Sequence, residues 1–350
     1  MTEPDARLDG LSELADEIDR VLARFIEPGE EVAFVNFPNI DNPGDSLLWL
    51  GVRAALDRRG ARLAAVFEPR TYRPGLLRRA VGEGGKILIG PGGNLGDLYP
   101  RSPQQAVRER VLRDFRRASV IQLPQSLYFQ RERRAKRFAR LATAHDDFTL
   151  ILREHESVER AAAMGLQSVL CPDIAFALDP IRRPGDPDCD VYWVARLGPE
   201  AKHELPELAP GVVAGDFPSA VEQRSGKAGR LLAAELAVNR ALVAGARRGG
   251  TGSGVAQRLA ARRYDALAHQ RVRLATRAVA RGRALVTDRF HGHALAVLMG
   301  IPHVLLDNVY GKNRSLYDAW TSRFSLAHWA DEPADAQRIA LELAASSTLD

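Results

Sequence analysis

The densest group of chemically reactive side chains in this sequence is a six-residue segment that holds Asp288, Arg289, His291 and His293. An arginine offers a planar pair of donors to a carboxylate or phosphate, and a histidine can transfer a proton near neutral pH. The segment follows an apolar run, Ala284–Thr287, and opens a helical pattern, so unpaired backbone N–H groups lie nearby. These features predict an anion site with a proton donor. The alternative is a capped turn with packed histidines.

Three further cations follow apolar runs that read as strands. They are Arg153 after Phe148–Leu152, Arg196 after Asp190–Ala195, and Lys312 in the loop after Pro302–Leu306. Only five of the 49 basic residues are lysine, which makes a lysine in this loop notable. The carboxyl ends of parallel strands meet at one edge of a sheet, so we predict that these side chains serve one anionic ligand. Arg196 is a reserve for Arg153, and a solvent-exposed lysine is the alternative for Lys312.

Neutral amides and acids gather in two earlier turns. Asn42 and Asp45 belong to the turn at residues 39–46, and Asn94 and Asp97 belong to the glycine-rich turn at residues 90–97. Such side chains suit the hydroxyls of a sugar, and glycines let the backbone approach a ligand closely. Capping alone could explain the first turn, because Asp45 or Ser46 would be an ordinary N-cap for the helix that follows.

The elements that must position these residues alternate along the chain. Predicted strands cover Glu31–Phe37, Arg62–Phe67, Lys86–Ile89, Ser119–Leu123, Phe148–Leu152 and Ser168–Cys171, and predicted helices cover Leu47–Arg58, Gln104–Arg117, Arg131–Ala144 and Ser157–Met164. Continuous apolar strands that alternate with amphipathic helices indicate a parallel, doubly wound sheet. The odd polar residues stand where these strands end, which is where such sheets bind ligands.

A proline- and aspartate-rich segment, Asp179–Asp188, has no periodicity and is typical of a linker. After it the pattern restarts with strands at Asp190–Ala195, Ala284–Thr287 and Pro302–Leu306 and helices at Ala228–Ala246, Val255–Arg281, Ala294–Met299 and Ala334–Ala344. We therefore predict an α/β protein with two Rossmann-like domains, residues 1–180 and 189–350, facing a cleft. The glycine tract at residues 247–254 lacks a preceding strand and a lysine-serine ending, so it predicts a flexible connection instead of a phosphate loop.

Composition excludes several classes of protein. Hydrophobic residues make up 45% and charged residues 27% of the 350 residues, as in globular proteins. No apolar run approaches the roughly 20 residues of a membrane span, and the acidic N-terminus does not resemble a secretory signal. Two cysteines cannot build a disulfide framework. We expect a cytoplasmic protein, at or near the inner face of the membrane.

The excess of basic residues in this chain does not indicate a nucleic-acid partner. The net charge is +5, but the basic tract at residues 131–140 has no interleaved aromatic platform for bases. We interpret this basic tract first as the solvent-exposed face of a helix. The alternative is that it binds an anionic membrane surface or an anionic substrate.

Taken together, these segments resemble the polysaccharide pyruvyl transferase family. The motifs are Asn42-Pro43-Gly44-Asp45, Gly90-Pro91-Gly92-Gly93-Asn94, Leu123-Pro124-Gln125-Ser126, Arg153-Glu154-His155-Glu156-Ser157, Cys171-Pro172-Asp173-Ile174-Ala175, Thr287 to His293, Gly300-Ile301-Pro302 and Tyr310-Gly311-Lys312. The arginine-x-histidine-glycine-histidine element is the most specific of them. Departures are Phe290 where relatives often have leucine, Glu154 where they have aspartate, and Pro43 in place of a more open turn.

The resemblance implies a two-domain, glycosyltransferase-B-type enzyme that moves the enolpyruvyl unit of phosphoenolpyruvate onto two hydroxyls of a glycan. A cyclic pyruvate ketal forms and phosphate is released. Donor binding then falls to Arg153, Arg289, Lys312, His293 and the reserve Arg196, and His291 becomes the proton donor, as a charged histidine. The first domain holds the acceptor, and both a lipid-linked and a polymeric glycan stay open as its form. No metal or cofactor is expected, and phosphoenolpyruvate is a co-substrate.

Two other functions stay open at this point. A sugar-nucleotide glycosyltransferase of the same fold is one, although no glutamate follows the Arg289 segment at helical spacing to hold a ribose. A non-catalytic glycan-binding relative is the other. Joint retention of Arg289, His291 and Lys312 argues against it.

Overall fold

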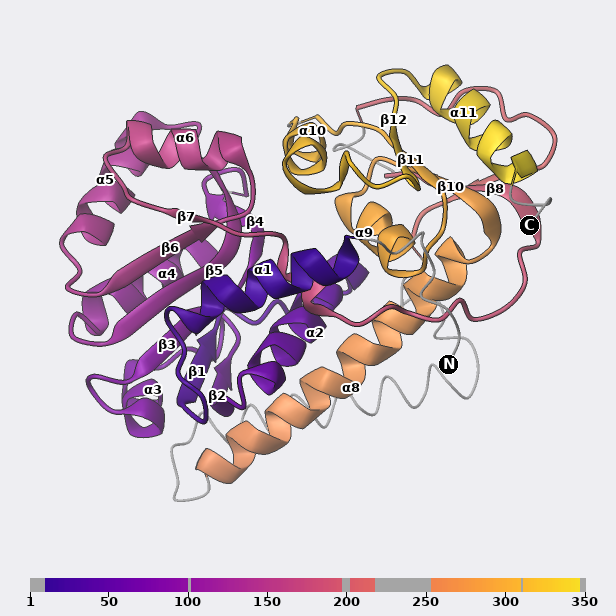
Figure 1. Cartoon of the computed structure of the whole chain (residues 1–350). Helices are drawn as coiled ribbons and strands as arrows, with labels where there is room; N and C mark the ends of the chain where they lie inside the picture. Colours follow the sequence, from indigo (N-terminus) through magenta and orange to yellow (C-terminus); the bar gives the residue numbers. More distant parts are fainter. Residues whose placement is uncertain (1–9, 100–101, 197–201, 218–252, 310, 347–350) are drawn as a thin grey trace.

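The computed structural model describes residues 10–99, 102–196, 202–217, 253–309 and 311–346. Within them the chain forms two parallel β-sheets flanked by helices (Figure 1). The predicted α/β class with parallel sheets is confirmed. The predicted helix at Ala228–Ala246 and most of the glycine tract lie outside the described residues, and the domain division at residues 180 and 189 stays a prediction.

The first sheet has the strand order β2-β1-β3-β5-β6-β7, with β4 paired to β5. Its strands are β1 (Glu31–Val35), β2 (Arg62–Phe67), β3 (Lys86–Ile89), β4 (Gly92–Gly96), β5 (Ser119–Tyr128), β6 (Phe148–Leu152) and β7 (Val169–Leu170). Its helices are α1 (Leu11–Ala23), α2 (Pro43–Arg58), α3 (Pro74–Val81), α4 (Gln104–Asp114), α5 (Glu132–Thr143), α6 (His155–Ala163) and the 3-10 turn η2 (Ile174–Ala177).

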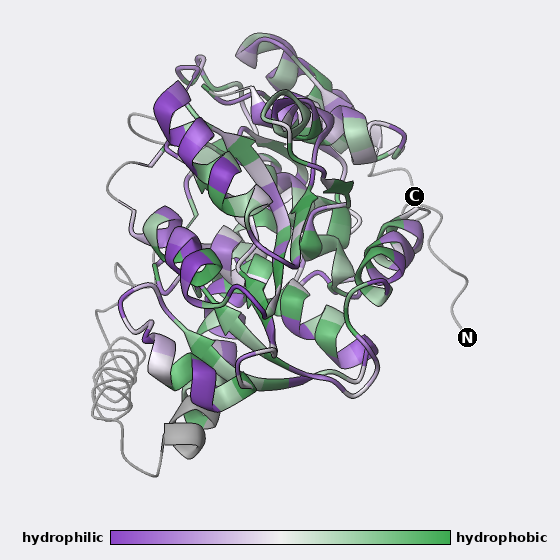
Figure 2. Cartoon of the chain, turned by 90° about the vertical axis from the view of Figure 1, so that its left-hand side faces the viewer, coloured by the Kyte–Doolittle hydropathy of each residue, from purple (hydrophilic) through white to green (hydrophobic). Residues whose placement is uncertain are grey.

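Both faces of this sheet are buried, as the continuous apolar strands require. On β1, Val32 and Phe34 pack with α1, α2 and η2, whereas Ala33 and Val35 pack with α3, α4 and α5 on the opposite face. Figure 2 shows the result: hydrophobic residues fill the strands and inner helix faces, and hydrophilic stripes run along the outer helices.

The second sheet has the order β12-β11-β10-β8-β9. Its strands are β8 (Cys189–Val194), β9 (Val212–Gly215), β10 (Gly282–Thr287), β11 (His303–Leu305) and β12 (Ala327–Trp329), and its helices are α8 (Ser253–Val279), α9 (Phe290–Leu298), α10 (Lys312–Leu316), the π-helical η4 (Tyr317–Thr321) and α11 (Pro333–Ser346). Helix α11 covers one face through Ala336, Ala340 and Ala344, and α8 and α9 lie on the other.

Helix α8 reaches from the second sheet across to the first, where it packs against α2 and β2 (Figure 1). There Tyr264 stacks on Phe37 with ring centroids 3.9 Å apart, and the Trp49 indole donates to Asp265 at 2.8 Å. One hydrophobic core therefore runs continuously through α1, α2, α8 and α9. This helix ties the loops that follow the strands of one sheet to those of the other.

The glycine-rich turn at residues 90–97 is partly a strand, which corrects the expectation of a loop. Strand β5 continues past Pro124 to Tyr128, and β4 pairs with this extension. Proline has no N–H to donate, and the register of β5 against β6 shifts between Gln122 and Gln125 around it. The local pattern broke at the proline, so the second half of β5 was not expected.

Two helices begin earlier than expected, and both starts lie beside the site described below. Helix α2 begins at Pro43 instead of Leu47, because proline suits the first helical position and Asn42 caps it. Helix α9 begins at Phe290 instead of Ala294, so His291 and His293 are helical residues. The expected linker, Asp179–Asp188, forms no helix or strand, and its Ile181 N–H donates to the Leu298 carbonyl at 2.7 Å.

Candidate active site

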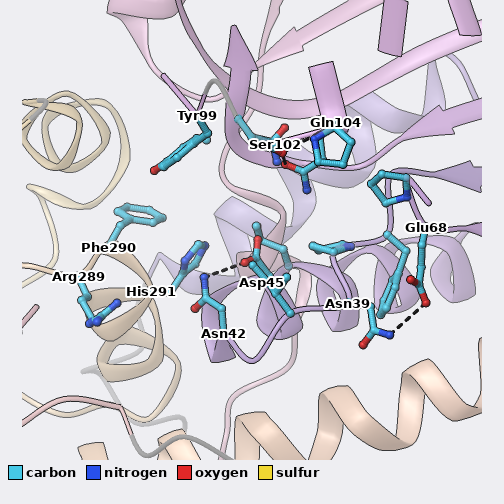
Figure 3. Close-up of a pocket in the computed structure, with 18 of the residues that line it drawn as sticks. Asn39, Asn42, Asp45, Glu68, Tyr99, Ser102, Gln104, Arg289, Phe290 and His291 are labelled. Carbon is cyan, nitrogen blue, oxygen red and sulfur yellow. Dashed lines mark hydrogen bonds between the residues drawn. The ribbon is translucent and has the colours of Figure 1, made fainter. Parts of the chain in front are cut away.

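A pocket of about 640 Å³ lies where the strands of both sheets end (Figure 3). Its lining residues include Phe37, Asn39, Asn42, Asp45, Glu68, Gly93, Asn94, Tyr99, Gln104, Arg153, Arg196, Phe217, Arg289, Phe290, His291 and Lys312. Many of these residues stand in the segments that directly follow β1, β2, β6, β8, β9 and β10. Ligand sites beyond the carboxyl ends of parallel strands are a general property of such sheets.

Arg153 is buried at the end of β6, with 2% of its surface exposed. Its Nε donates to the Ser126 hydroxyl at 2.9 Å, and Nη1 forms an ion pair with the buried Asp173. The remaining nitrogen, Nη2, lies against Gly93: a Cβ atom added to this glycine would be 3.2 Å from it. Glu154 lies 3.8 Å from Nε as a second, longer ion pair. The guanidinium is thus held in place from one side and keeps a nitrogen beside the pocket.

Lys312 approaches the same point from the second sheet. It is the first residue of α10, after Gly311 in the left-handed conformation with φ 72°. The same added Cβ at Gly93 would lie 3.6 Å from Nζ of Lys312. The structure therefore brings Lys312 and Arg153 together at one backbone position, although 159 residues separate them in the sequence.

Arg289 and Arg196 line the pocket from the ends of β10 and β8. Nη2 of Arg289 pairs with Asp216, and its buried Nε has no hydrogen-bond partner among the described residues. The backbone N–H of Arg196 donates to Asp288 at 2.8 Å, which fixes the two strand ends to each other. Four cationic side chains are thereby gathered in one pocket.

His291 lies at the start of α9 and packs against the start of α2. A Cβ atom added to Gly44 would lie only 2.4 Å from Nδ1 of His291, so this contact requires the glycine. Its Nε2 is buried and has no hydrogen-bond partner in the part of the chain that the structure describes. Burial, together with the charges of Arg153, Lys312 and Arg196, lowers the pKa of His291 to about 4. The expectation of a charged histidine is corrected: without a ligand the imidazole is neutral at pH 7.

Asn42 and Asp45 form one unit at the start of α2 (Figure 3). Asn42 is the N-cap: its Oδ1 accepts from the Gly44 N–H at 3.0 Å, and its Nδ2 donates to Asp45 at 2.7 Å. The expectation that Asp45 or Ser46 caps the helix is therefore wrong. Burial raises the pKa of Asp45 to about 6, against the opposing effects of Asn42 and of nearby Lys312.

Two predicted site residues lie outside the pocket lining. Asp97 is buried, and its carboxylate accepts from the backbone N–H groups of Gln130 and Arg131 at 2.6 and 3.2 Å. His293 is fully buried and hydrogen-bonds with His303 at 2.7 Å and with Thr321 at 2.9 Å. The side chain of Asp97 holds the loop after β5, and the side chain of His293 holds the start of α9. Of Asn94 and Asp97, the two predicted residues of the glycine-rich turn, Asn94 lines the pocket and Asp97 does not.

Sequence reasoning missed several residues of this site. Glu68 directly follows β2 and accepts from Asn39 at 3.0 Å and from Tyr264, so the strand-end rule could have found it. Asp173 was seen only as part of a motif, and no local signal marks Tyr99 or the charge of Arg271 near Asp45. These contacts depend on elements that are distant in the sequence.

Comparison with known proteins agrees with this geometry. The sequence matches the family described as polysaccharide pyruvyl transferase over residues 42–308, which contain Arg153, Arg289 and His291. The chain belongs to this family. EpsO of Bacillus subtilis strain 168, whose name includes pyruvyl transferase, is 26% identical over 292 residues, which cover 83% of this chain and 85% of EpsO. Pyruvyl transferase 1 of Schizosaccharomyces pombe is 26% identical over 306 residues, which cover 83% of this chain and 70% of the yeast protein.

The fold is also found in a solved structure. A crystal structure of a functionally uncharacterised protein of Klebsiella pneumoniae aligns with a TM-score of 0.58 and 16% identity, and covers 91% of this chain and 98% of that one. This likeness speaks for the fold alone. As a member of the polysaccharide pyruvyl transferase family, this chain is an enzyme of pyruvyl transfer to polysaccharide.

The described residues contain neither a cluster of metal ligands nor a helix that could cross a membrane. No group of three or more histidine, cysteine, aspartate or glutamate side chains is arranged to hold a metal ion there. In the same part of the chain, no helix combines the length and the apolar character needed to cross a membrane.

Proposed function

We propose that this protein transfers the pyruvyl unit of phosphoenolpyruvate to two hydroxyls of one sugar in a cell-surface polysaccharide, with formation of a cyclic ketal and release of phosphate. The two sheets then act as the two Rossmann-like domains of a glycosyltransferase-B-type enzyme. The observation that carries the proposal is the convergence of Arg153, Arg196, Arg289 and Lys312 on one pocket that also holds His291. Phosphoenolpyruvate carries a carboxylate and a phosphate, and this charge needs several cationic partners.

Donor binding is assigned to the cationic side. Arg289 has a buried Nε without a partner, and Arg153 keeps Nη2 beside Gly93, so each arginine retains a donor for an anionic oxygen. The paired acids Asp173 and Asp216 hold the guanidinium groups in place before the ligand arrives. Such preorganised donors stabilise the charge that builds up on the leaving phosphate.

The proposed chemistry starts with a proton on C3 of the donor. His291 gives this proton, C2 becomes cation-like, and the first sugar hydroxyl adds to it. The C2–O bond to phosphate then breaks, and the second hydroxyl closes the ketal. Of the two hydroxyl protons, one replaces the proton given to C3 and the other leaves on the phosphate, so the products are the ketal and hydrogen phosphate.

His291 can serve as an acid only after its pKa rises from about 4. The negative charges of a bound donor raise it, because an opposite charge within about 4–6 Å favours the protonated imidazole. We therefore expect donor binding to take up a proton near pH 7. Calorimetric titration of phosphoenolpyruvate in buffers of different ionisation enthalpy measures this uptake, and His291→Gln should abolish it.

Asp45 and Asn42 are proposed to face the acceptor, because they line the same pocket from the start of α2 with a carboxylate and an amide that suit hydroxyl groups. With a pKa of about 6, Asp45 is mostly ionised at pH 7 and can accept a hydroxyl proton. Asp45→Asn should reduce turnover more than donor affinity. A variant that lost only folded yield would show that Asp45 is structural.

The deciding experiment measures phosphate release from phosphoenolpyruvate with and without a panel of glycans, with product masses checked for the ketal. Hydrolysis of sugar nucleotides is measured in parallel and should be absent. We expect His291→Gln to lower the single-turnover rate about 10²- to 10⁴-fold. Arg289→Ala should weaken donor binding about tenfold to a hundredfold, as loss of a charge-assisted hydrogen bond predicts. Near-normal ketal formation by folded His291→Gln would refute its role.

A further inference from the structure

A buried arginine that forms no ion pair with a described residue lies behind the pocket. Arg108 of α4 has no exposed surface, and within the described residues it forms no ion pair. Its three nitrogens donate to neutral amide oxygens: Nε to Gln122 at 2.6 Å, Nη1 to Gln105 at 2.7 Å and Nη2 to Asn94 at 2.9 Å. Burial lowers the pKa of Arg108 to about 9, so the group still carries its charge at pH 7.

An uncompensated buried charge is costly, and structures normally pair it. The adjacent Glu109 contributes electrostatically, but its carboxylate is engaged by Arg137 at 2.9 Å and by the Gln105 amide at 3.3 Å. Arg108 therefore contributes positive charge behind the wall formed by Asn94. An anion in the pocket would compensate that charge.

The contacts of Asn94 fix the direction of its amide. The Oδ1 atom accepts from Arg108 and also from Gln125 at 3.2 Å, while the Asn94 backbone N–H donates to Gln125 at 3.0 Å. A flipped amide would place its NH₂ group against two donors, which is excluded. The Nδ2 atom has no hydrogen-bond partner among the described residues, and Asn94 lines the pocket. Asn94 thus offers the pocket a donor and not an acceptor.

Asn94 directly follows the backbone position that two of the cationic side chains approach. Gly93, the preceding residue, is the backbone position that Nη2 of Arg153 and Nζ of Lys312 both approach. We propose that Asn94 binds an anionic oxygen of the donor substrate through Nδ2, and that Arg108 is the positioning residue that holds the amide in this orientation. The inference rests on the proposed function and moves Asn94 from the predicted acceptor side to the donor side.

The test uses two probes, inorganic phosphate and pyruvate, whose dissociation constants are measured by calorimetry on the full chain. Asn94→Ala should weaken binding of at least one probe about 10- to 100-fold, as loss of a hydrogen bond to a charged group predicts. Asn94→Asp, which has the same shape but replaces the donor by a negative charge, should weaken it further. The probe affected identifies the anionic end that Asn94 binds.

The matched control is Asn39→Ala, since Asn39 is another asparagine of the pocket lining but donates to Glu68 on the side of β2. It should leave both affinities unchanged. Arg108 is tested by a double-mutant cycle, because its replacement alone changes folding stability as well. Arg108→Lys should weaken phosphate or pyruvate binding in the wild-type background and cause little further loss in the Asn94→Ala background. Additive losses would show a purely structural role.

The outcomes separate this inference from the proposed function. If the wild type binds neither phosphoenolpyruvate nor phosphate, the proposed function fails. If the wild type binds both, but Asn94→Asp binds phosphate and pyruvate as tightly as the wild type, the donor role of Asn94 alone is overturned.

Discussion

At the residue scale, Gly44 and His291 make a close contact between the start of α2 and the start of α9. No side chain fits at Gly44, because even a Cβ atom would be 2.4 Å from Nδ1 of His291. The imidazole can occupy this position only because residue 44 is a glycine and has no side chain. Its orphaned Nε2 is left as the nitrogen that can serve a ligand.

Gly44→Ala should displace His291 and reduce the rate of pyruvyl transfer by about tenfold or more, since general-acid catalysis depends on close geometry. Gly75→Ala is the control, because Gly75 is also near a helix start and its added Cβ meets nothing within 4 Å. Rates are compared at equal folded concentration. Equal rates for the two variants would show that the position of His291 does not matter.

A second residue-scale feature is the buried chain of His303, His293 and Thr321. Nδ1 of His303 lies 2.8 Å from the Ile301 carbonyl, which can only accept, so this nitrogen carries the proton. Nε2 of His303 then accepts from His293, whose own Nε2 accepts from the Thr321 hydroxyl. The arrangement needs both rings neutral, and burial accordingly lowers the pKa of His303 to about 4.

The pKa of His303 is about 4 in the folded chain, below the ordinary histidine value of 6.5 that applies to the unfolded chain. Between these two pH values, the unfolded chain binds a proton at His303 and the folded chain does not. Stability should therefore fall as the pH drops through this interval, by at most about 3 kcal/mol for this group. The raised pKa of Asp45 has the opposite effect, because it makes the folded chain more stable as the pH falls. The test therefore compares the free energy of unfolding of the wild type with that of a His303 variant, in which the Asp45 contribution is the same. Denaturant unfolding of wild type and His303→Gln should show a stability gap that narrows from pH 7 to pH 4. A constant gap would contradict the assignment.

At the scale of elements, the start of α2 contributes both to the stability of the helix and to the lining of the pocket. Asn42 caps the helix through Oδ1 and holds Asp45 through Nδ2, so one side chain has two separable contacts. Pro43 at the first helical position adds a fixed backbone angle. The early start of α2 is what places Asp45 in the pocket.

Two replacements separate these contacts. Asn42→Ala removes the cap and should cost about 1 kcal/mol of stability together with activity. Asn42→Ser keeps a capping oxygen but loses the amide bond to Asp45, so thermal unfolding should change little while turnover falls. If Asn42→Ser retains full turnover, Asn42 is only a cap and its acceptor role is disproved.

At the scale of the whole molecule, charge is concentrated on one outer helix. Helix α5 lies at the end of the first sheet that is far from the second sheet (Figure 1). Arg131, Arg133, Arg134, Arg137 and Arg140 line a surface hollow of about 540 Å³ there. The inner face of the helix is held by Phe138 and Ala142, so the arginines are its outer face. Peripheral contact with an anionic membrane surface stays a prediction, and we assign that contact to the arginine-lined face of α5.

We expect the protein to sediment with vesicles that contain phosphatidylserine, less so at high salt, and not with pure phosphatidylcholine vesicles. Neutralising Arg133, Arg134 and Arg140 to glutamine should weaken this binding about a hundredfold, at about 1 kcal/mol per basic residue. The control neutralises the exposed Arg62, Arg323 and Arg338 on other elements. Equal binding by both triple variants would contradict the assignment to α5.

The sequence by itself determined many of the elements and the class of site. The predicted bounds of β2, β3 and β6 are those of the structure, because short apolar runs between polar turns carry the strand signal locally. The family motifs and the strand-end rule selected Arg153, Arg289, His291 and Lys312, and all four line the pocket. Residue type and position relative to a strand end are properties that a linear pattern retains.

Only the tertiary structure decided how those residues behave. Burial among cations made His291 neutral, and a partner 10 residues away turned His293 into a core residue. The extension of β5 pairs with β4, and the amide network around Arg108 fixes the orientation of the Asn94 side chain. Desolvation, ion pairing and hydrogen-bond direction depend on neighbours that come from distant parts of the chain, and a local pattern contains no information about them.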